Sequence, residues 1–169
     1  HKGIVASLTT GVKEGDAIGG MDVAICAVDY KKRSLEFAGA GRPLLIFRSG
    51  KEEVYSGNKF PIGLVVDRQG KYSNIYQDGG NGSTGNSNVK SEKINLKKGD
   101  SFYIFTDGYC DQFGGADGKK FMRDRFSKLL MELQGKNMHE QEIALDSAFE
   151  QWKGKNPQVD DILVIGVRV

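Results

Sequence analysis

Several features that define common classes of protein are missing from this chain. No apolar stretch approaches the ~18 residues that suggest a membrane span, and nothing resembles a signal peptide. The formal charge is +2, from 24 basic and 22 acidic residues in a chain of 169, and no basic stripe stands out. We therefore expect neither nucleic acid nor a membrane surface as a partner of this segment.

Histidine and cysteine are scarce as well. The two histidines, His1 and His139, are too few and too far apart for a histidine-based metal site, and we expect His139 to face water near the start of a helix. The two cysteines, Cys26 and Cys110, lie in or beside strand-like segments. Buried thiols in a reducing compartment, the cytoplasm, are therefore the expectation.

Neither cysteine fits a cysteine-dependent phosphatase. Such an enzyme needs an arginine at a fixed short distance after its nucleophile, in the loop that cradles the phosphate. Lys32 and Ala116 occupy those positions here. The spacing therefore excludes this class of phosphatase.

A chain of this length is expected to form one domain, residues 1–169. It begins at His1 without a methionine, and its opening stretch, HKGIVASLTT, has the pattern of the end of a helix. We therefore expect a domain that lacks its N-terminal part. The Gly/Ser/Asn-rich stretch at 78–88 contains no apolar residue and predicts an exposed loop.

Short strand patterns separated by turns fill most of the chain. Strands are expected in 21–29, in two pieces of 35–50, and in 51–57, 92–100, 102–106 and the last residues after Asp161. A bend is expected at Pro61 and Gly63. Hairpin-type links dominate, which favours antiparallel sheets with helices packed on them, an α+β layered domain.

Two helices are expected at 119–133 and 139–152, each with an apolar stripe that we assign to the core. The stripes are Met122, Phe126, Leu129, Leu130 and Leu133 in the first helix, and Ile143, Leu145, Ala148, Phe149 and Trp152 in the second.

Acidic residues stand at the ends of two strands. Asp107-Gly108 follows the strand at 102–106, and Asp160-Asp161 precedes the last strand. If these strands pair antiparallel, the exit of one lies beside the entrance of the other, and the carboxylates converge. Convergent carboxylates repel unless a cation lies between them, and all-oxygen ligands favour Mg²⁺ or Mn²⁺. Gly108 would let the backbone bend sharply and bring a carbonyl near the metal.

Each acidic element also has a purely structural interpretation. Asp-Gly after a strand is ordinary turn chemistry, and Asp-Asp before a strand can simply mark its start. Other acidic motifs fit poorly. Neither Asp107-Gly108 nor Asp117-Gly118 has the alternating acids and late glutamate of an EF-hand. Tyr109 stands where an aspartyl-nucleophile phosphatase usually has its second aspartate.

Taken together, the motifs resemble one family over nearly the whole chain. GMDVAICAVD, LEFAGAGRPLLIFRSG, FPIGLV, LKKGDSFYIFTDGYCDQF and DDILVIGVRV occur in the order and at the spacings of the SpoIIE-like branch of the PPM (protein phosphatase 2C-like) serine/threonine phosphatases. The resemblance implies an αββα four-layer sandwich of antiparallel sheets flanked by helices, with a centre of two Mn²⁺ or Mg²⁺ ions at one edge.

The resemblance also implies roles for individual residues. Asp107 matches the acidic metal ligand of the TDG element, followed by Gly108, and Asp111 matches an acid often found shortly after it. Asp160 matches the metal-binding acid before the last strand, with Asp161 as its neighbour. Asp107 and Asp160 are thus the expected catalytic residues, because the metals activate the attacking water and offset charge on the phosphoryl oxygens.

This sequence departs from the family pattern in several places. No residue matches the family's early Asp-Gly metal ligand. Arg42 replaces a histidine common in the family's AGHNP-like turn; an arginine there could contact phosphate, but we expect an exposed turn residue. Asp22 is unusual in its strand, and either faces the metal edge or is a polar residue of an edge strand.

The leading interpretation is a metal-dependent protein serine/threonine phosphatase of bacterial signal transduction. The resemblance implies a phosphorylated regulatory protein as substrate, such as an anti-sigma-factor antagonist, and an attached N-terminal sensor domain. One alternative is a catalytically inactive phosphatase-fold module that binds or regulates a partner. Another is a generic acidic domain that binds cations without phosphatase activity.

Overall fold

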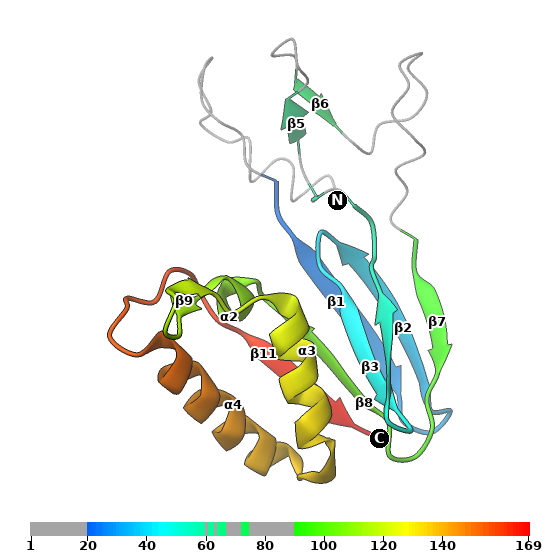
Figure 1. Ribbon diagram of the computed structural model, residues 1–169. Helices are drawn as coiled ribbons and strands as arrows, with labels where there is room; N and C mark the ends of the chain where they lie inside the picture. Colours follow the sequence, from blue (N-terminus) through cyan, green and yellow to red (C-terminus); the bar gives the residue numbers. More distant parts are fainter. Residues whose placement is uncertain (1–19, 60, 63, 67–71, 75–89) are drawn as a thin grey trace.

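Two antiparallel sheets form the centre of the computed structural model (Figure 1), which describes residues 20–59, 61–62, 64–66, 72–74 and 90–169. The first sheet has the strand order β1-β2-β7, and the second has the order β11-β8-β3-β4. Their strands are β1 (Val23–Asp29), β2 (Ser34–Ala40), β7 (Glu92–Asn95), β11 (Val164–Arg168), β8 (Ser101–Phe105), β3 (Leu44–Arg48) and β4 (Lys51–Tyr55).

The helices follow β8 in the chain. They are α2 (Gly108–Asp111), α3 (Arg123–Glu132), the 3₁₀ turn η1 (Leu133–Gly135) and α4 (Met138–Lys153). A small hairpin of β9 (Phe113–Gly114) and β10 (Lys119–Lys120) separates α2 from α3, and β5 (Leu64–Val66) pairs with β6 (Tyr72–Asn74). α4 begins with a capping box, in which Asn137 and Glu140 bond each other's backbone N–H groups.

The central strands of the four-stranded sheet, β3 and β8, are buried on both faces because they alternate apolar side chains between two cores. In β3, Leu44 and Ile46 face the other sheet, whereas Leu45 and Phe47 belong to the core beneath the helices. The core between the sheets comprises Leu35, Phe37, Leu44, Ile46, Ile94, Leu96 and Phe102. The helix-side core includes Tyr103, Phe105, Tyr109, Phe126, Leu130, Leu145 and Phe149.

The order of layers is therefore helices, four-stranded sheet and three-stranded sheet (Figure 1). The expected α+β class with antiparallel sheets is confirmed, and the described residues make three of the four layers of an αββα sandwich. Each of the two expected helical stretches forms a helix, and each predicted strand within the described residues is present. The described part of the chain has no helix long and apolar enough to cross a membrane.

Three local expectations were wrong. The stretch after Gly108, for which no helix or strand was expected before residue 119, contains α2 and the β9–β10 hairpin, and the next helix begins at Arg123 rather than 119. Met122 is 57% exposed and Ile143 is 54% exposed, so neither belongs to its apolar stripe. Met122 precedes α3 with a φ of 73°, outside helical geometry, which turns it away from the face that carries Phe126 and Leu130.

Two expectations concern residues outside the described part of the chain. These are the helix end at 1–10 and the exposed loop at 78–88. Of the expected bend at Pro61 and Gly63, Gly63 also lies outside it, while Ile62 forms a bridge with Met21.

Replacing Phe126 by alanine should test the helix-side core. Phe126 is fully buried, and its ring centroid lies 4.8 Å from those of Phe105 and Tyr109. We expect Phe126→Ala to lower the free energy of unfolding by about 3–5 kcal/mol, measured by urea denaturation. Ile143→Ala on the exposed side of α4 is the control and should change it by less than about 1 kcal/mol. Equal effects of the two substitutions would contradict this packing.

Candidate functional site

The ends of β8 and β11 lie side by side, as the acidic motifs require. The two strands pair antiparallel, with Phe105 opposite Val164. Beyond the last pair, Thr106 continues the contact: its amide donates to the carbonyl of Leu163 at 3.0 Å, and its hydroxyl donates to the carbonyl of Asp161 at 2.9 Å. The same hydroxyl accepts from the amide of Leu163 at 2.9 Å. The predicted convergence of the two acidic segments is therefore present in the backbone.

The conformation of Gly108 differs from the expected one. It begins the short helix α2, and its φ is not in the left-handed region, so no sharp glycine bend occurs there. A Cβ atom at Gly108 would lie 2.4 Å from the carbonyl oxygen of Asp161. Glycine is needed because the two acidic segments approach too closely for a side chain.

A second support for the Asp160 segment comes from Gln112, a buried residue that sequence reasoning missed. Its Nε2 donates to the carbonyl of Pro157 at 2.9 Å, and its Oε1 accepts from the amide of Val159 at 3.3 Å. The segment before Asp160 is therefore held from the end of α2. A glutamine at the end of a short helix gives no sequence signal for such a role, because its partners are distant in the chain.

The side chains of the acid pair are open to solvent. Asp160 and Asp161 are both exposed, and Asp160 Oδ1 accepts from the amide of Asp161 at 2.7 Å. Among the described residues, no hydrogen bond or ion pair links either carboxylate to that of Asp107. Asp111, near Asp107, pairs instead with Lys120 at 2.9 Å.

Arg42 is the direct partner of the Asp107 carboxylate. Its Nη2 lies 2.8 Å from Asp107 Oδ2 and 3.1 Å from Asp22 Oδ2. Its side chain is only 20% exposed. The expectation of an exposed turn residue was wrong, because the guanidinium turns inward to offset two carboxylates. Asp22, whose orientation was left open, faces the same edge as Asp107.

Local backbone geometry explains how Asp22 and Arg42 meet. Gly41 has a φ of 70°, and a Cβ atom there would lie 2.2 Å from Asp22 Oδ1. Pro43 follows Arg42 and favours extended backbone in it. The turn therefore presents Arg42 beside a carboxylate packed on Gly41. Sequence reasoning identified the turn but not this contact.

The donor chemistry of this edge suits a hard divalent cation, since Asp22, Asp107 and the Asp160 segment offer only oxygen atoms. Within the described residues, however, no group of three or more His, Cys, Asp or Glu side chains is arranged to hold a metal ion. The carboxylate of Asp107 thus offers the donor atoms that such a cation prefers, but the described part of the chain does not form a metal site.

Neither cysteine has the properties of a nucleophile. Burial raises the pKa of Cys26 to about 11, and burial together with the nearby Asp111 raises that of Cys110 to about 11. Cys110 lies in α2, next to the acidic edge, and is buried. Both residues are free thiols that stay protonated near neutral pH, as the sequence spacing indicated.

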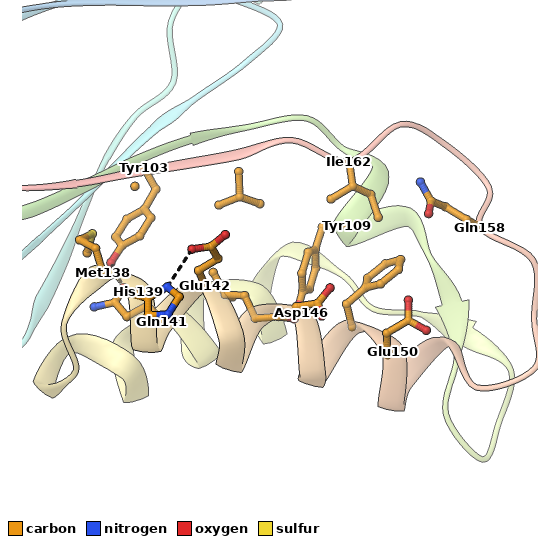
Figure 2. Close-up of a pocket in the computed structure, with 14 residues that line it drawn as sticks. Tyr103, Tyr109, Met138, His139, Gln141, Glu142, Asp146, Glu150, Gln158 and Ile162 are labelled. Atoms are coloured by element: carbon orange, nitrogen blue, oxygen red, sulfur yellow. Dashed lines mark hydrogen bonds and ion pairs between the residues drawn. The ribbon is translucent and has the colours of Figure 1, made fainter.

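A cavity of about 590 Å³ lies between α4 and strands β8 and β11 (Figure 2). Tyr103, Tyr109 and Ile162 line it, and Glu142 and Asp146 of α4 are on its rim. His139, at the start of α4, is 78% exposed as expected and lies 3.3 Å from Glu142. The cavity contains neither Asp107 nor Arg42, so it is separate from the acidic edge.

Solved structures with the same fold are phosphatase domains. The SiaA-PP2C domain of Pseudomonas aeruginosa is 26% identical, with a TM-score of 0.74 over 98% of this chain and 56% of its own. The SpoIIE phosphatase domain of Bacillus subtilis, in a crystal form without domain swapping, is 18% identical, with a TM-score of 0.54 over 99% and 70% of the two chains. Another structure of that domain, described as Mn presoaked, is 15% identical, with a TM-score of 0.54 over 88% and 56%.

The present chain thus spans little more than half of the SiaA domain. Among curated protein sequences, none matches it significantly. The sequence profile described as Stage II sporulation protein E (SpoIIE) matches residues 4–169. Because that match covers nearly the whole chain, and the fold is that of PP2C-type phosphatase domains, the chain belongs to the SpoIIE family.

Proposed function

We propose that this chain is part of a metal-dependent protein serine/threonine phosphatase domain. The observation that carries the proposal is the meeting of the Asp107 and Asp161 segments at paired strand ends, with Thr106 bonded to Asp161 and Gly108 packed against it. Membership of the SpoIIE family supports the same function. We also propose that residues 1–169 belong to a single domain.

In this proposal Asp107 and Asp160 are the catalytic metal ligands. The carbonyl of Gly108 and the neighbouring Asp161 complete this chain's contribution, and the ions are two Mn²⁺ or Mg²⁺. A relative of the same fold was soaked with Mn, which supports the choice of a hard divalent ion. When bound, such ions supply a water of lowered pKa and positive charge toward a phosphoryl group. The contribution of this chain is to hold carboxylate oxygens at the edge where its two acidic segments meet.

The proposed substrate is phosphoserine or phosphothreonine on a regulatory protein, such as an anti-sigma-factor antagonist. Family membership supports this choice, and the solved SpoIIE structure that includes a fragment of a regulatory domain supports control of the phosphatase by a further domain. By the same reasoning, an N-terminal sensor domain in the parent protein would control the phosphatase, and the protein would act in bacterial signal transduction in the cytoplasm.

One observation favours a second candidate function. In the described part of the chain, the carboxylate of Asp107 is bonded to Arg42, and no three potential ligands come together. A phosphatase-fold module that binds a partner without catalysis would have such an edge. The two functions differ in whether Asp107 is needed for turnover, and this can be measured directly.

Substitution of Asp107 by asparagine tests the proposed enzyme. We expect Asp107→Asn in the full-length protein to lower Mn²⁺-dependent hydrolysis of p-nitrophenyl phosphate at least about 100-fold, because a neutral amide is a poor ligand for a hard divalent cation. The far-UV circular dichroism should stay unchanged, because the Asp107 side chain is 45% exposed.

The matched control is Asp117→Asn, which removes an acid that is 74% exposed and whose ion pair among the described residues is with Lys119. Its activity should equal that of the unsubstituted protein. Undiminished turnover in Asp107→Asn would contradict the metal-ligand role. Absence of Mn²⁺-dependent turnover in the unsubstituted full-length protein would favour the binding module.

Thiol chemistry gives a separate test of mechanism. With a pKa of about 11, each cysteine is overwhelmingly in the thiol form at pH 7.5, and the reactive thiolate grows only as the pH rises toward 11. We expect iodoacetamide at pH 7.5 to leave phosphatase activity unchanged, and Cys110→Ser to retain most of it. Rapid inactivation that Cys110→Ser abolishes would show that the thiol takes part.

A further inference from the structure

Arg42 occupies an unusual position at the acidic edge. The turn that carries it joins β2 of the three-stranded sheet to β3 of the four-stranded sheet. The carboxylates that it contacts come from both sheets: Asp22 precedes β1, and Asp107 follows β8. A single nitrogen, Nη2, contacts both of them. The guanidinium therefore lies between two carboxylates that would otherwise repel each other.

A comparison with Arg48 distinguishes the contacts of Arg42 with Asp22 and Asp107 from a purely structural ion pair. Arg48 bonds Asp100, whose side chain is 4% exposed and also accepts from the amide of Lys97. That carboxylate is closed to dissolved ions. In contrast, the carboxylates of Asp22 and Asp107 are 37% and 45% exposed. A small cation from solvent can reach them and compete with the guanidinium.

We propose that Arg42 is a built-in counter-ion that competes with a divalent cation for Asp107 and so sets the metal affinity of this edge. The inference rests on the proposed function, in which Asp107 binds metal. A cation on Asp107 Oδ2 and a guanidinium nitrogen 2.8 Å from the same atom cannot both keep their positions. Their mutual repulsion adds to this exclusion, since a unit charge beside a divalent ion changes an equilibrium constant by about tenfold or more.

The kind of side chain at position 42 matters for this role. A neutral imidazole does not offset two carboxylates, whereas the guanidinium is charged at every accessible pH. With arginine, the edge holds together without metal, and metal binding has to displace an ion pair. Arg42 is thus a positioning residue that acts on metal affinity through Asp107 and need not touch the reacting atoms.

Direct measurement of Mn²⁺ binding tests this, in full-length protein stripped of metal with a chelator and then dialysed. We expect Arg42→Gln to lower the Kd for Mn²⁺, measured by titration calorimetry or by electron paramagnetic resonance of free Mn²⁺, at least about tenfold. Arg42→Lys keeps the charge and should stay closer to the unsubstituted protein. The matched control is Lys120→Gln, which removes the same charge from the neighbouring pair with Asp111 and should leave the Kd within about twofold.

The outcomes separate this inference from the proposed function. If Asp107→Asn loses Mn²⁺ binding but Arg42→Gln binds as weakly as the unsubstituted protein or more weakly, the counter-ion role is wrong and the metal site stands. If neither the unsubstituted protein nor Arg42→Gln binds Mn²⁺, both the metal-dependent function and the counter-ion role are wrong. If Lys120→Gln tightens binding as much as Arg42→Gln, the effect is one of net charge, and the specific role is overturned.

Thermal melting gives a second readout in case Arg42→Gln is less stable. With chelator present, the substitution should lower the Tm, because two carboxylates then lose their shared partner. Saturating Mn²⁺ should raise the Tm of Arg42→Gln more than that of the unsubstituted protein, because tighter binding of Mn²⁺ stabilises the folded state more. An equal gain in both proteins would overturn the proposal.

Discussion

The pairing of β8 with β11 is the interaction on which the rest of the site depends. Beyond the last strand pair, the hydroxyl of Thr106 bonds both the carbonyl of Asp161 and the amide of Leu163. These contacts bring the acidic segments together without relying on their carboxylates. Repulsion between like charges would push the segments apart, and the backbone bonds, together with Gln112 at Pro157 and Val159, resist it. The fold thus supplies the position, and the aspartates supply the charge.

The second constraint is the short crossover between the two sheets. Gly41 and Pro43 flank Arg42 in the link between β2 and β3, and β3 is buried on both faces. Because β3 is fixed by two cores, the crossover has little freedom, and Arg42 is delivered to the same edge as Asp107. The site is therefore built from the ends of both sheets. A change in how the sheets pack would move Asp22 relative to Asp107.

The sequence predicted well what depends on local pattern. The strands, the two main helices and the antiparallel meeting of Asp107 with the last strand all follow from apolar spacing and turn residues near each position. It failed where a role depends on a distant partner. Arg42 and Asp107 are 65 positions apart, and their contact depends on how the two sheets are joined. Gly108 was correctly singled out, but its reason, contact with Asp161, is visible only once β8 and β11 are paired.

The charges at this edge explain why it can be both a stable part of the fold and a candidate metal site. Arg42 offsets one of the two charges of Asp22 and Asp107, so the group remains negative, and the exposed Asp160 and Asp161 lie on the adjoining segment. Such an edge attracts cations. The guanidinium keeps it from depending on metal for its shape, because the carboxylates already share a partner. Thr106, Gly108 and Gln112 thus fix the backbone of this edge, while Arg42 and the aspartates set its charge.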